Sequence, residues 1–235
     1  MKRRMDINKL LQEKQYLKDD WDLSNETLYS MCREYSSNCD TQSILAKSLI
    51  IGRTYAVALE RRKSLKGSSG DTPSAAGLDS DRFYKDYIVR RFKEINLDED
   101  LEDMRNWTIK NLLEFDETQI KAVLSLHSRL SKIIEGGVIK RSFASKYLHF
   151  HLPDIFFIYD SRAVESIKFL SGIQFEKNKK RARDIGDDEH YDLEYKKFYY
   201  NCLEALRWLK RNHQIDRLDP RQFDNLLMAI YEEKR

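Results

Sequence analysis

Apolar side chains recur in this chain at intervals of three and four residues, the spacing that places them on one face of an α-helix. One such run comprises Val123, Leu124, Leu126, Leu130 and Ile133. Only 8 Gly and 3 Pro occur in 235 residues, and no stretch alternates apolar and polar residues as a half-buried strand does. With 41% hydrophobic residues, the chain can bury a sizeable core. The pattern predicts an all-α protein, folded as a two-lobed helical bundle.

Two segments of different composition divide the predicted helices. Residues 67–80 are rich in Gly and Ser and lack bulky side chains, so we expect a flexible loop there. Residues 176–190 carry a basic run followed by an acidic group, which is typical of a solvated, charged loop. The sequence therefore predicts an N-terminal helical region at 1–66, a central helical lobe at 81–175, and C-terminal helices at 191–235 that pack on the N-terminal region.

The composition excludes several classes of protein without indicating a function. The 42 Lys and Arg nearly balance 39 Asp and Glu, so only local clusters of basic residues can indicate a polyanionic partner. No apolar run reaches the roughly 18 residues of a membrane helix, so we expect a cytoplasmic protein without a membrane partner. Cys32, Cys39 and Cys202 form no CxxC pair, which argues against a disulfide framework and against a cysteine zinc site.

The most informative segment lies in the second half of the chain. A helical run ends near Gly136 and Gly137, and a short helix, SFASKYLHFH, follows with Ser142 as its expected N-cap. Pro153 ends that helix. The apolar stretch PDIFFIY then leads to Asp160, which we expect to cap a third helix. The predicted order is helix, glycine hairpin, helix, extended stretch and capped helix.

This order resembles that of the helix-hairpin-helix DNA glycosylases of the 8-oxoguanine glycosylase and endonuclease III type. The resemblance covers about 55 residues. It departs from the family in the hairpin EGGVIKR, which lacks the usual Gly-hydrophobic-Gly turn, and in the spacing of 14 from Lys146 to Asp160. The resemblance implies that Lys146 is the nucleophile and that Asp160 assists it. No cysteine quartet can hold an iron–sulfur cluster, so we expect no cofactor.

Lys146 and Asp160 also suit this chemistry on physical grounds. The helix carries the chain only about 9 Å away from Lys146, and the stretch after Pro153 can return up to ~26 Å. The positive field at a helix N-terminus favours a neutral amine, which can attack the sugar C1′ and form a Schiff base. A carboxylate held ionised by backbone N–H groups stabilises a cationic sugar. If Lys146 is only structural, Asp160 orients a water and the enzyme is monofunctional.

Basic residues around the predicted turn are candidates for contacts to DNA phosphates. Lys132, Lys140 and Arg141 flank the turn. The backbone N–H groups of Gly136 and Gly137 can add an anion contact at close range. The alternative for all of these residues is an ordinary solvated face.

A second basic cluster precedes the Gly- and Ser-rich segment. It begins at Arg53 and ends in the run Arg61, Arg62, Lys63 and Lys66. An extruded base needs an aromatic side chain on which to stack, and Tyr55 and Tyr159 are the candidates, with burial in the core as the alternative.

The leading interpretation is a monomeric DNA N-glycosylase that extrudes and removes a damaged or modified base from double-stranded DNA. It would act in DNA repair or in defence against phage with modified DNA, with abasic-site lyase activity if Lys146 forms the Schiff base. A non-catalytic helical DNA-binding protein is one alternative. A bacterial nuclease or toxin acting on RNA through His149 or His151 is another. These two histidines diverge on a helix, which argues against a metal site.

Overall fold

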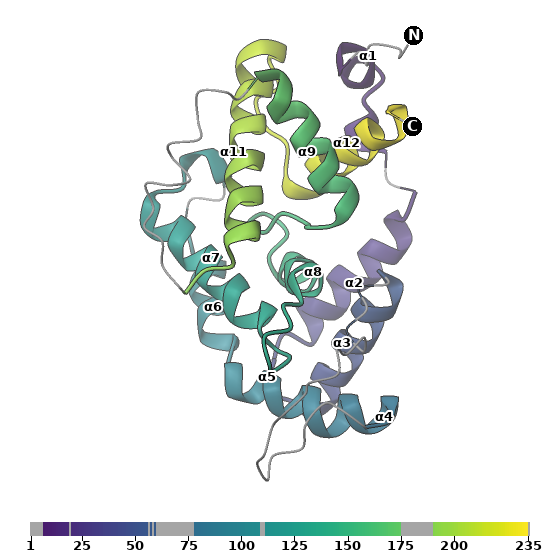
Figure 1. The fold of residues 1–235 in the computed structure, drawn as a ribbon, viewed down its shortest axis with the longest axis vertical. Coiled ribbons are helices and arrows are strands. Elements are labelled where there is room, and N and C mark those ends of the chain that lie inside the picture. The colour runs from purple at the N-terminus through teal and green to yellow at the C-terminus, as the bar shows by residue number, and fades with distance from the viewer. Residues whose placement is uncertain are drawn as a thin grey trace. The chain divides into compact units, whose positions relative to one another are not determined.

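The computed structural model describes residues 7–18, 20–55, 57, 59, 78–108, 111–174 and 190–234. All regular structure in these residues is helical and none is a strand, which confirms the all-α prediction (Figure 1). The chain divides into two compact units, each assembled from separate segments. Unit 1 comprises Met1–Asp22, Ile109–Leu124 and Pro153–Arg235, and unit 2 comprises Leu23–Thr108 and Ser125–Leu152. The boundaries expected from composition stay a prediction, because 60–77 and 175–189 lie outside the described residues.

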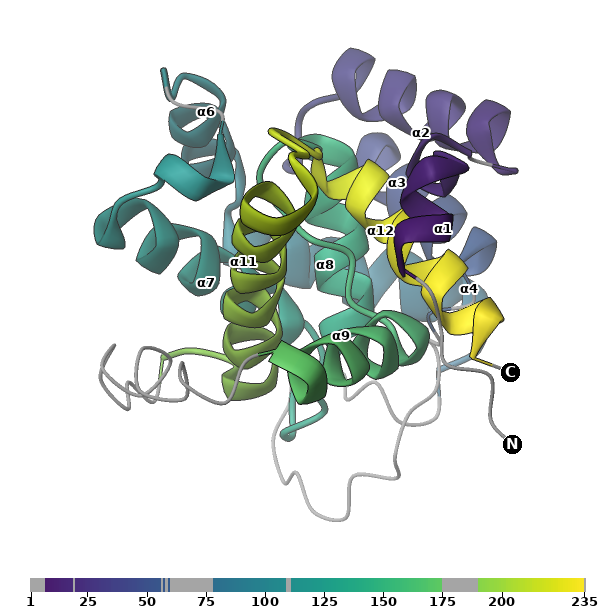
Figure 2. The same cartoon turned by 90° about the horizontal axis from the view of Figure 1, so that it is seen from above.

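Unit 1 is built around three long helices. Its elements are α1 (Ile7–Gln12), η1 (Gln15–Leu17), η3 (Leu112–Glu114), the first half of α7 (Glu117–Ser131), α9 (Ser161–Gln174), α11 (Leu193–His213) and α12 (Pro220–Glu233). Helix α12 packs against α9, η1 and α1, and α11 packs against α9 (Figure 2). The ring of Phe157 lies 5.1 Å from that of Tyr199 and 5.7 Å from that of Phe223. These aromatic contacts join the stretch before α9 to the two C-terminal helices.

Local capping bonds explain where two helices of unit 1 begin. The Asp192 side chain accepts hydrogen bonds from the backbone N–H groups at the start of α11. Asp219 accepts from the backbone nitrogen of Gln222 at 2.8 Å, and Gln222 accepts from the backbone nitrogen of Asp219 at 3.2 Å. Pro220 occupies the first turn, where its missing N–H costs nothing. The start of α12 after Asp219 therefore follows from local capping bonds.

Unit 2 packs its helices around α8. Its elements are α2 (Asp22–Glu34), α3 (Thr41–Thr54), α4 (Ser80–Arg82), the π-helical η2 (Phe83–Ile88), α5 (Val89–Ile95), α6 (Asp98–Arg105), the second half of α7 and α8 (Arg141–His151). Helix α3 packs against η2, α5 and α8 (Figure 1). All nine residues from 143 to 151 are buried. The ring of Tyr147 lies 4.9 Å from that of Phe92 and 5.5 Å from that of Phe143, so aromatic packing holds α8 against α5.

A buried lysine ties the end of α2 to the rest of unit 2. The Nζ of Lys47 donates to the carbonyl oxygens of Tyr35 at 2.9 Å and Ser37 at 2.8 Å, and to Oδ1 of Asn38 at 2.9 Å. Asn38 in turn donates its side-chain amide to Asp98 at 2.7 Å. Burial lowers the pKa of Lys47 to about 8, although the Asp98 carboxylate opposes the shift. The amine therefore satisfies carbonyls that follow a helix end, where backbone acceptors lack partners.

The stability contributed by Lys47 is expected to depend on pH. Its pKa is about 8 in the folded protein against 10.5 for the unfolded chain, so the unfolded state binds the extra proton between these values. The free energy of unfolding of the wild type, relative to Lys47→Met, should rise by about 3 kcal/mol from pH 8 to pH 10.5, and this gain is lost as the pH falls. Urea unfolding of both proteins across this range measures it. A constant difference would show that Lys47 keeps its proton in the folded state.

Candidate functional site

Helix α8 carries the residues on which the sequence places most weight. It ends at His151, because Leu152 precedes Pro153 and adopts a non-helical φ of −140°. Its N-cap is Lys140, which makes no side-chain capping bond. The prediction that Ser142 is the N-cap is therefore wrong. Ser142 lies within the first turn, where its carbonyl oxygen accepts a hydrogen bond from Oγ of Ser145 at 3.1 Å.

The side chain of Lys146 is withdrawn from water. Lys146 is only 3% exposed, and its Nζ donates to Oγ of Ser142 at 2.9 Å. The same Nζ lies 5.6 Å from the centre of the Tyr55 ring, within reach of a cation–π interaction. Lys146, the predicted nucleophile, and Tyr55, one of the two predicted stacking residues, thus lie close together in unit 2.

Further polar and aromatic side chains adjoin this lysine. The hydroxyl of Tyr55 donates to Oδ1 of Asn25, which is 2% exposed on α2. The Tyr55 ring lies 5.5 Å from that of Phe150. We name Asn25, Tyr55, Ser142 and Lys146 the lysine site. Sequence inspection missed Asn25, because no local pattern pairs it with a residue at the end of α3. The spacing of four between Ser142 and Lys146 is a signal that could have found that pair.

The two histidines of α8 are buried, and each contacts a tyrosine side chain. Nε2 of His149 shares a hydrogen bond of 2.7 Å with the hydroxyl of Tyr29. The His151 ring lies 5.0 Å from that of Tyr147, and burial lowers the pKa of His151 well below its usual value. His151 is therefore neutral. Within the described part of the chain, no group of three His, Cys, Asp or Glu side chains is placed to hold a metal ion.

Asp160 opens α9, as predicted. Its Oδ1 accepts from the backbone nitrogen of Ala163 at 2.9 Å, and its carbonyl oxygen accepts from that of Val164 at 3.0 Å. Nη2 of Arg162 lies 3.8 Å from Oδ2. The Asp160 side chain is 19% exposed. Asp160 belongs to unit 1 and Lys146 to unit 2, and their joint action stays a prediction.

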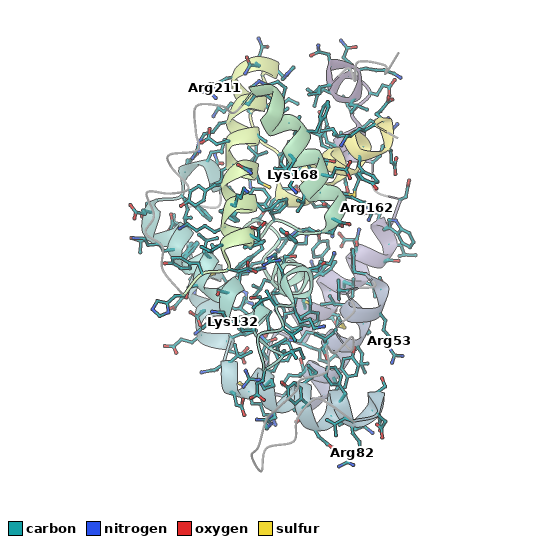
Figure 3. The ribbon with its side chains drawn as sticks, viewed as in Figure 1. Arg53, Arg82, Lys132, Arg162, Lys168 and Arg211 are labelled. Atoms are coloured by element: carbon teal, nitrogen blue, oxygen red, sulfur yellow. The ribbon has the colours of Figure 1, made fainter. Side chains whose placement is uncertain are left out.

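The turn between α7 and α8 contains the predicted phosphate contacts. Gly136 and Gly137 are exposed and have φ angles of 79° and 80°, a region that favours glycine. Lys132 is exposed, and Figure 3 labels it. Lys140 is only 8% exposed and Arg141 is partly buried, so Lys132 and the two glycines offer the more accessible surface of this turn.

Contacts within unit 2 hold this turn in place. The hydroxyl of Tyr87 accepts from the backbone nitrogen of Glu135 at 2.8 Å. Nε of Arg91 donates to the carbonyl oxygen of Ile133 at 3.1 Å, and its Nη1 lies 3.3 Å from Oε1 of Glu135. The backbone nitrogen of Lys140 donates to the carbonyl oxygen of Ser131 at 2.7 Å. Helix α7, the turn and α8 thus follow in the predicted order, while a helix-hairpin-helix element of the DNA-binding type stays a prediction.

The remaining predicted residues are not members of the lysine site. Arg53 is exposed in the last turn of α3 and is labelled in Figure 3. Tyr159 belongs to unit 1, where its ring lies 5.0 Å from that of Phe198 and 6.2 Å from that of Tyr195. The basic run Arg61, Arg62, Lys63 and Lys66 lies outside the described residues.

No protein-family profile, curated protein or solved structure matches the chain. None of the helices in the described residues is both long and apolar enough to cross a membrane.

Proposed function

We propose that this chain is a DNA N-glycosylase, with Lys146 as its nucleophile. The observation that carries the proposal is the environment of Lys146, a residue only 3% exposed whose Nζ donates to the Ser142 hydroxyl and lies 5.6 Å from the centre of the Tyr55 ring. Lysines are almost never this buried, because the side chain usually extends its charge into water. A withdrawn, hydrogen-bonded amine next to an aromatic face suits attack on a base-bearing sugar.

The proposed reaction exchanges one bond at the sugar C1′ for another. The lone pair of the deprotonated Lys146 amine forms the N–C1′ bond while the glycosidic bond breaks. The electron pair of the glycosidic bond leaves with the base, which takes up the first amine proton. The nitrogen lone pair then forms the C=N bond as the C1′–O4′ bond breaks, and O4′ takes up the second amine proton, which gives a Schiff base. Elimination from this intermediate cleaves the strand, and water then releases the lysine.

Two further residues complete the proposal. Tyr55 supplies the face on which the extruded base stacks, because base–aromatic stacking contributes about 1–3 kcal/mol and tolerates any base. Asp160 stabilises the positive charge that develops on the sugar, since a carboxylate fixed by a backbone N–H keeps its position while that charge forms. The proposed partner is double-stranded DNA with a damaged or phage-modified base, in the cytoplasm, with the protein acting as a monomer.

A panel of duplexes tests the function. Each duplex carries one oxidised, alkylated or phage-type modified base, and the products are scored for abasic sites with and without alkali. A parallel reaction contains borohydride, which reduces a Schiff base to a stable protein–DNA adduct. Base release with adduct supports Lys146 as nucleophile, and base release without adduct supports a monofunctional enzyme. Binding without base release would indicate the non-catalytic alternative, and cleavage of RNA alone would indicate the nuclease.

Replacing Lys132 by Gln is expected to weaken binding to all DNA sequences alike. A phosphate contact carries no base information, and removing one should reduce the slope of log affinity against log salt by roughly 1. Binding titrations at several salt concentrations measure this slope. Lys121→Gln is the control, because Lys121 lies on α7, which ends one residue before Lys132, and it pairs with Glu117 at 2.6 Å. An unchanged slope for Lys132→Gln would place the phosphate contacts elsewhere.

A further inference from the structure

Ser142 and Lys146 form a pair that depends on a single helix. Oγ of Ser142 accepts from Nζ of Lys146 at 2.9 Å, and the two residues lie one turn apart on the 11-residue α8. Residues four apart on a helix are neighbours on its surface. The backbone of α8 therefore keeps the two side chains adjacent.

Ser142 itself is held by the first turn of α8. Its carbonyl oxygen accepts from Oγ of Ser145 at 3.1 Å, and the backbone nitrogen of Ala144 donates to the carbonyl oxygen of Lys140 at 2.9 Å. The next turns are buried and packed against α3. A hydroxyl on such a rigid support can hold the end of a flexible lysine in one place.

We propose that Ser142 is a positioning residue, whose hydroxyl aims the Lys146 amine at the reacting carbon. A lysine has four rotatable side-chain bonds, so an amine without a fixed acceptor samples many directions. Productive attack needs the reacting atoms about 3–3.5 Å apart, and a displacement of about 1 Å can cost a hundredfold in rate. This inference rests on the proposed function. The Tyr55 ring, whose centre lies 5.6 Å from Nζ, is a second neighbour of the amine.

The hydroxyl also affects the amine's intrinsic reactivity, and in the opposite direction. An amine bonded to Oγ is held in one direction, whereas an amine freed from that bond can turn toward any small reagent that reaches it. Removing it should make the amine more reactive toward a small reagent that needs no alignment, while making it less productive toward DNA. Unfolding would expose the buried amine and raise its methylation rate as well, so the thermal unfolding midpoint of each variant is measured beside the two rates.

The experiment compares wild type with Ser142→Ala, Ser142→Thr and Ser48→Ala. One measurement is the rate of borohydride-trapped adduct with the best duplex of the panel, at saturating DNA. The other is the rate of Lys146 methylation by formaldehyde and cyanoborohydride in the absence of DNA, read by peptide mass spectrometry. Ser48 is the matched control, because it is a buried serine of α3 in the same unit whose hydroxyl donates to the backbone carbonyl oxygen of Leu45 at 3.3 Å and makes no hydrogen bond to any member of the lysine site.

We expect Ser142→Ala to lower the adduct rate about tenfold or more and to raise the methylation rate. Ser142→Thr, which restores a hydroxyl, should return both rates toward wild type, and Ser48→Ala should change neither. The thermal unfolding midpoint of Ser142→Ala should stay at that of wild type, and a lowered midpoint would attribute the changed rates to exposure of the amine and overturn the positioning role. Any other pattern for Ser142→Ala, including a parallel fall of both rates, overturns the positioning role. A wild type that never forms adduct rejects the proposed nucleophile instead, and the methylation rates then still decide whether Ser142 restrains the amine.

Discussion

Replacing Lys146 by Gln is expected to abolish the borohydride-trapped adduct, with a loss of about a thousandfold or more. The amide nitrogen of glutamine has no basic lone pair, so it cannot form a Schiff base. The substitution should leave the fold intact, because Gln keeps an N–H donor that can reach toward Oγ of Ser142 and has a similar apolar stem. Slow base release can persist, since Asp160 and the DNA contacts remain.

Lys196→Gln is the control for this prediction. Lys196 is also buried, at 4% exposed, and its Nζ lies 5.7 Å from the centre of the Tyr191 ring. It matches Lys146 in burial and aromatic contact but has no proposed role in the reaction. If Lys146→Gln still traps like wild type while Lys196→Gln or another lysine variant does not, the nucleophile has been misassigned.

Replacing Asp160 by Asn is expected to lower the rate of base release by roughly a hundredfold or more, without unfolding the protein. The amide oxygen of Asn can still accept from the backbone nitrogen of Ala163, so the cap of α9 is kept. The negative charge that would oppose the cationic sugar is lost. Single-turnover base release gives the rate, and thermal unfolding gives the stability.

Asp219→Asn controls for the capping role of a carboxylate. Asp219 caps α12 in the same unit through a 2.8 Å bond to the backbone nitrogen of Gln222, and it has no proposed part in the reaction. The control should leave base release unchanged. Near-normal base release by Asp160→Asn would remove Asp160 from the mechanism and leave it as a helix cap alone.

The helices of this protein are largely predictable because the signals that start and stop them are local. Asp160 and Asp219 each bond a backbone N–H three residues ahead, so their effect is visible in a window of four residues. Pro153 ends α8 for the same local reason. The sequence wrongly predicts Ser142 as an N-cap, because an N-cap serine and a first-turn serine have the same sequence signature. Its hydroxyl bonds a lysine side chain and not the backbone nitrogens of the turn.

The sequence does not predict which basic residues near the turn are exposed to solvent. Lys132 and Lys140 both flank the glycine turn in sequence, yet Lys132 is exposed and Lys140 is buried. Lys140 is the N-cap residue of the buried helix α8, and its backbone nitrogen donates to the carbonyl oxygen of Ser131 at 2.7 Å, whereas Lys132 lies just beyond the end of α7. A charge pattern along the chain does not contain this information, because it depends on which neighbours cover each side chain.

The sequence by itself determined that this protein is helical and where α9 and α12 begin, since these follow from apolar spacing and from capping residues. Only the tertiary structure decided that Tyr55 lies over Lys146 and that Asn25 receives the Tyr55 hydroxyl. The physical reason is that these residues come from three helical segments, α2, the end of α3 and α8, far apart in the chain. Their meeting is set by the packing of unit 2, and packing is a property of the whole core, not of any local window.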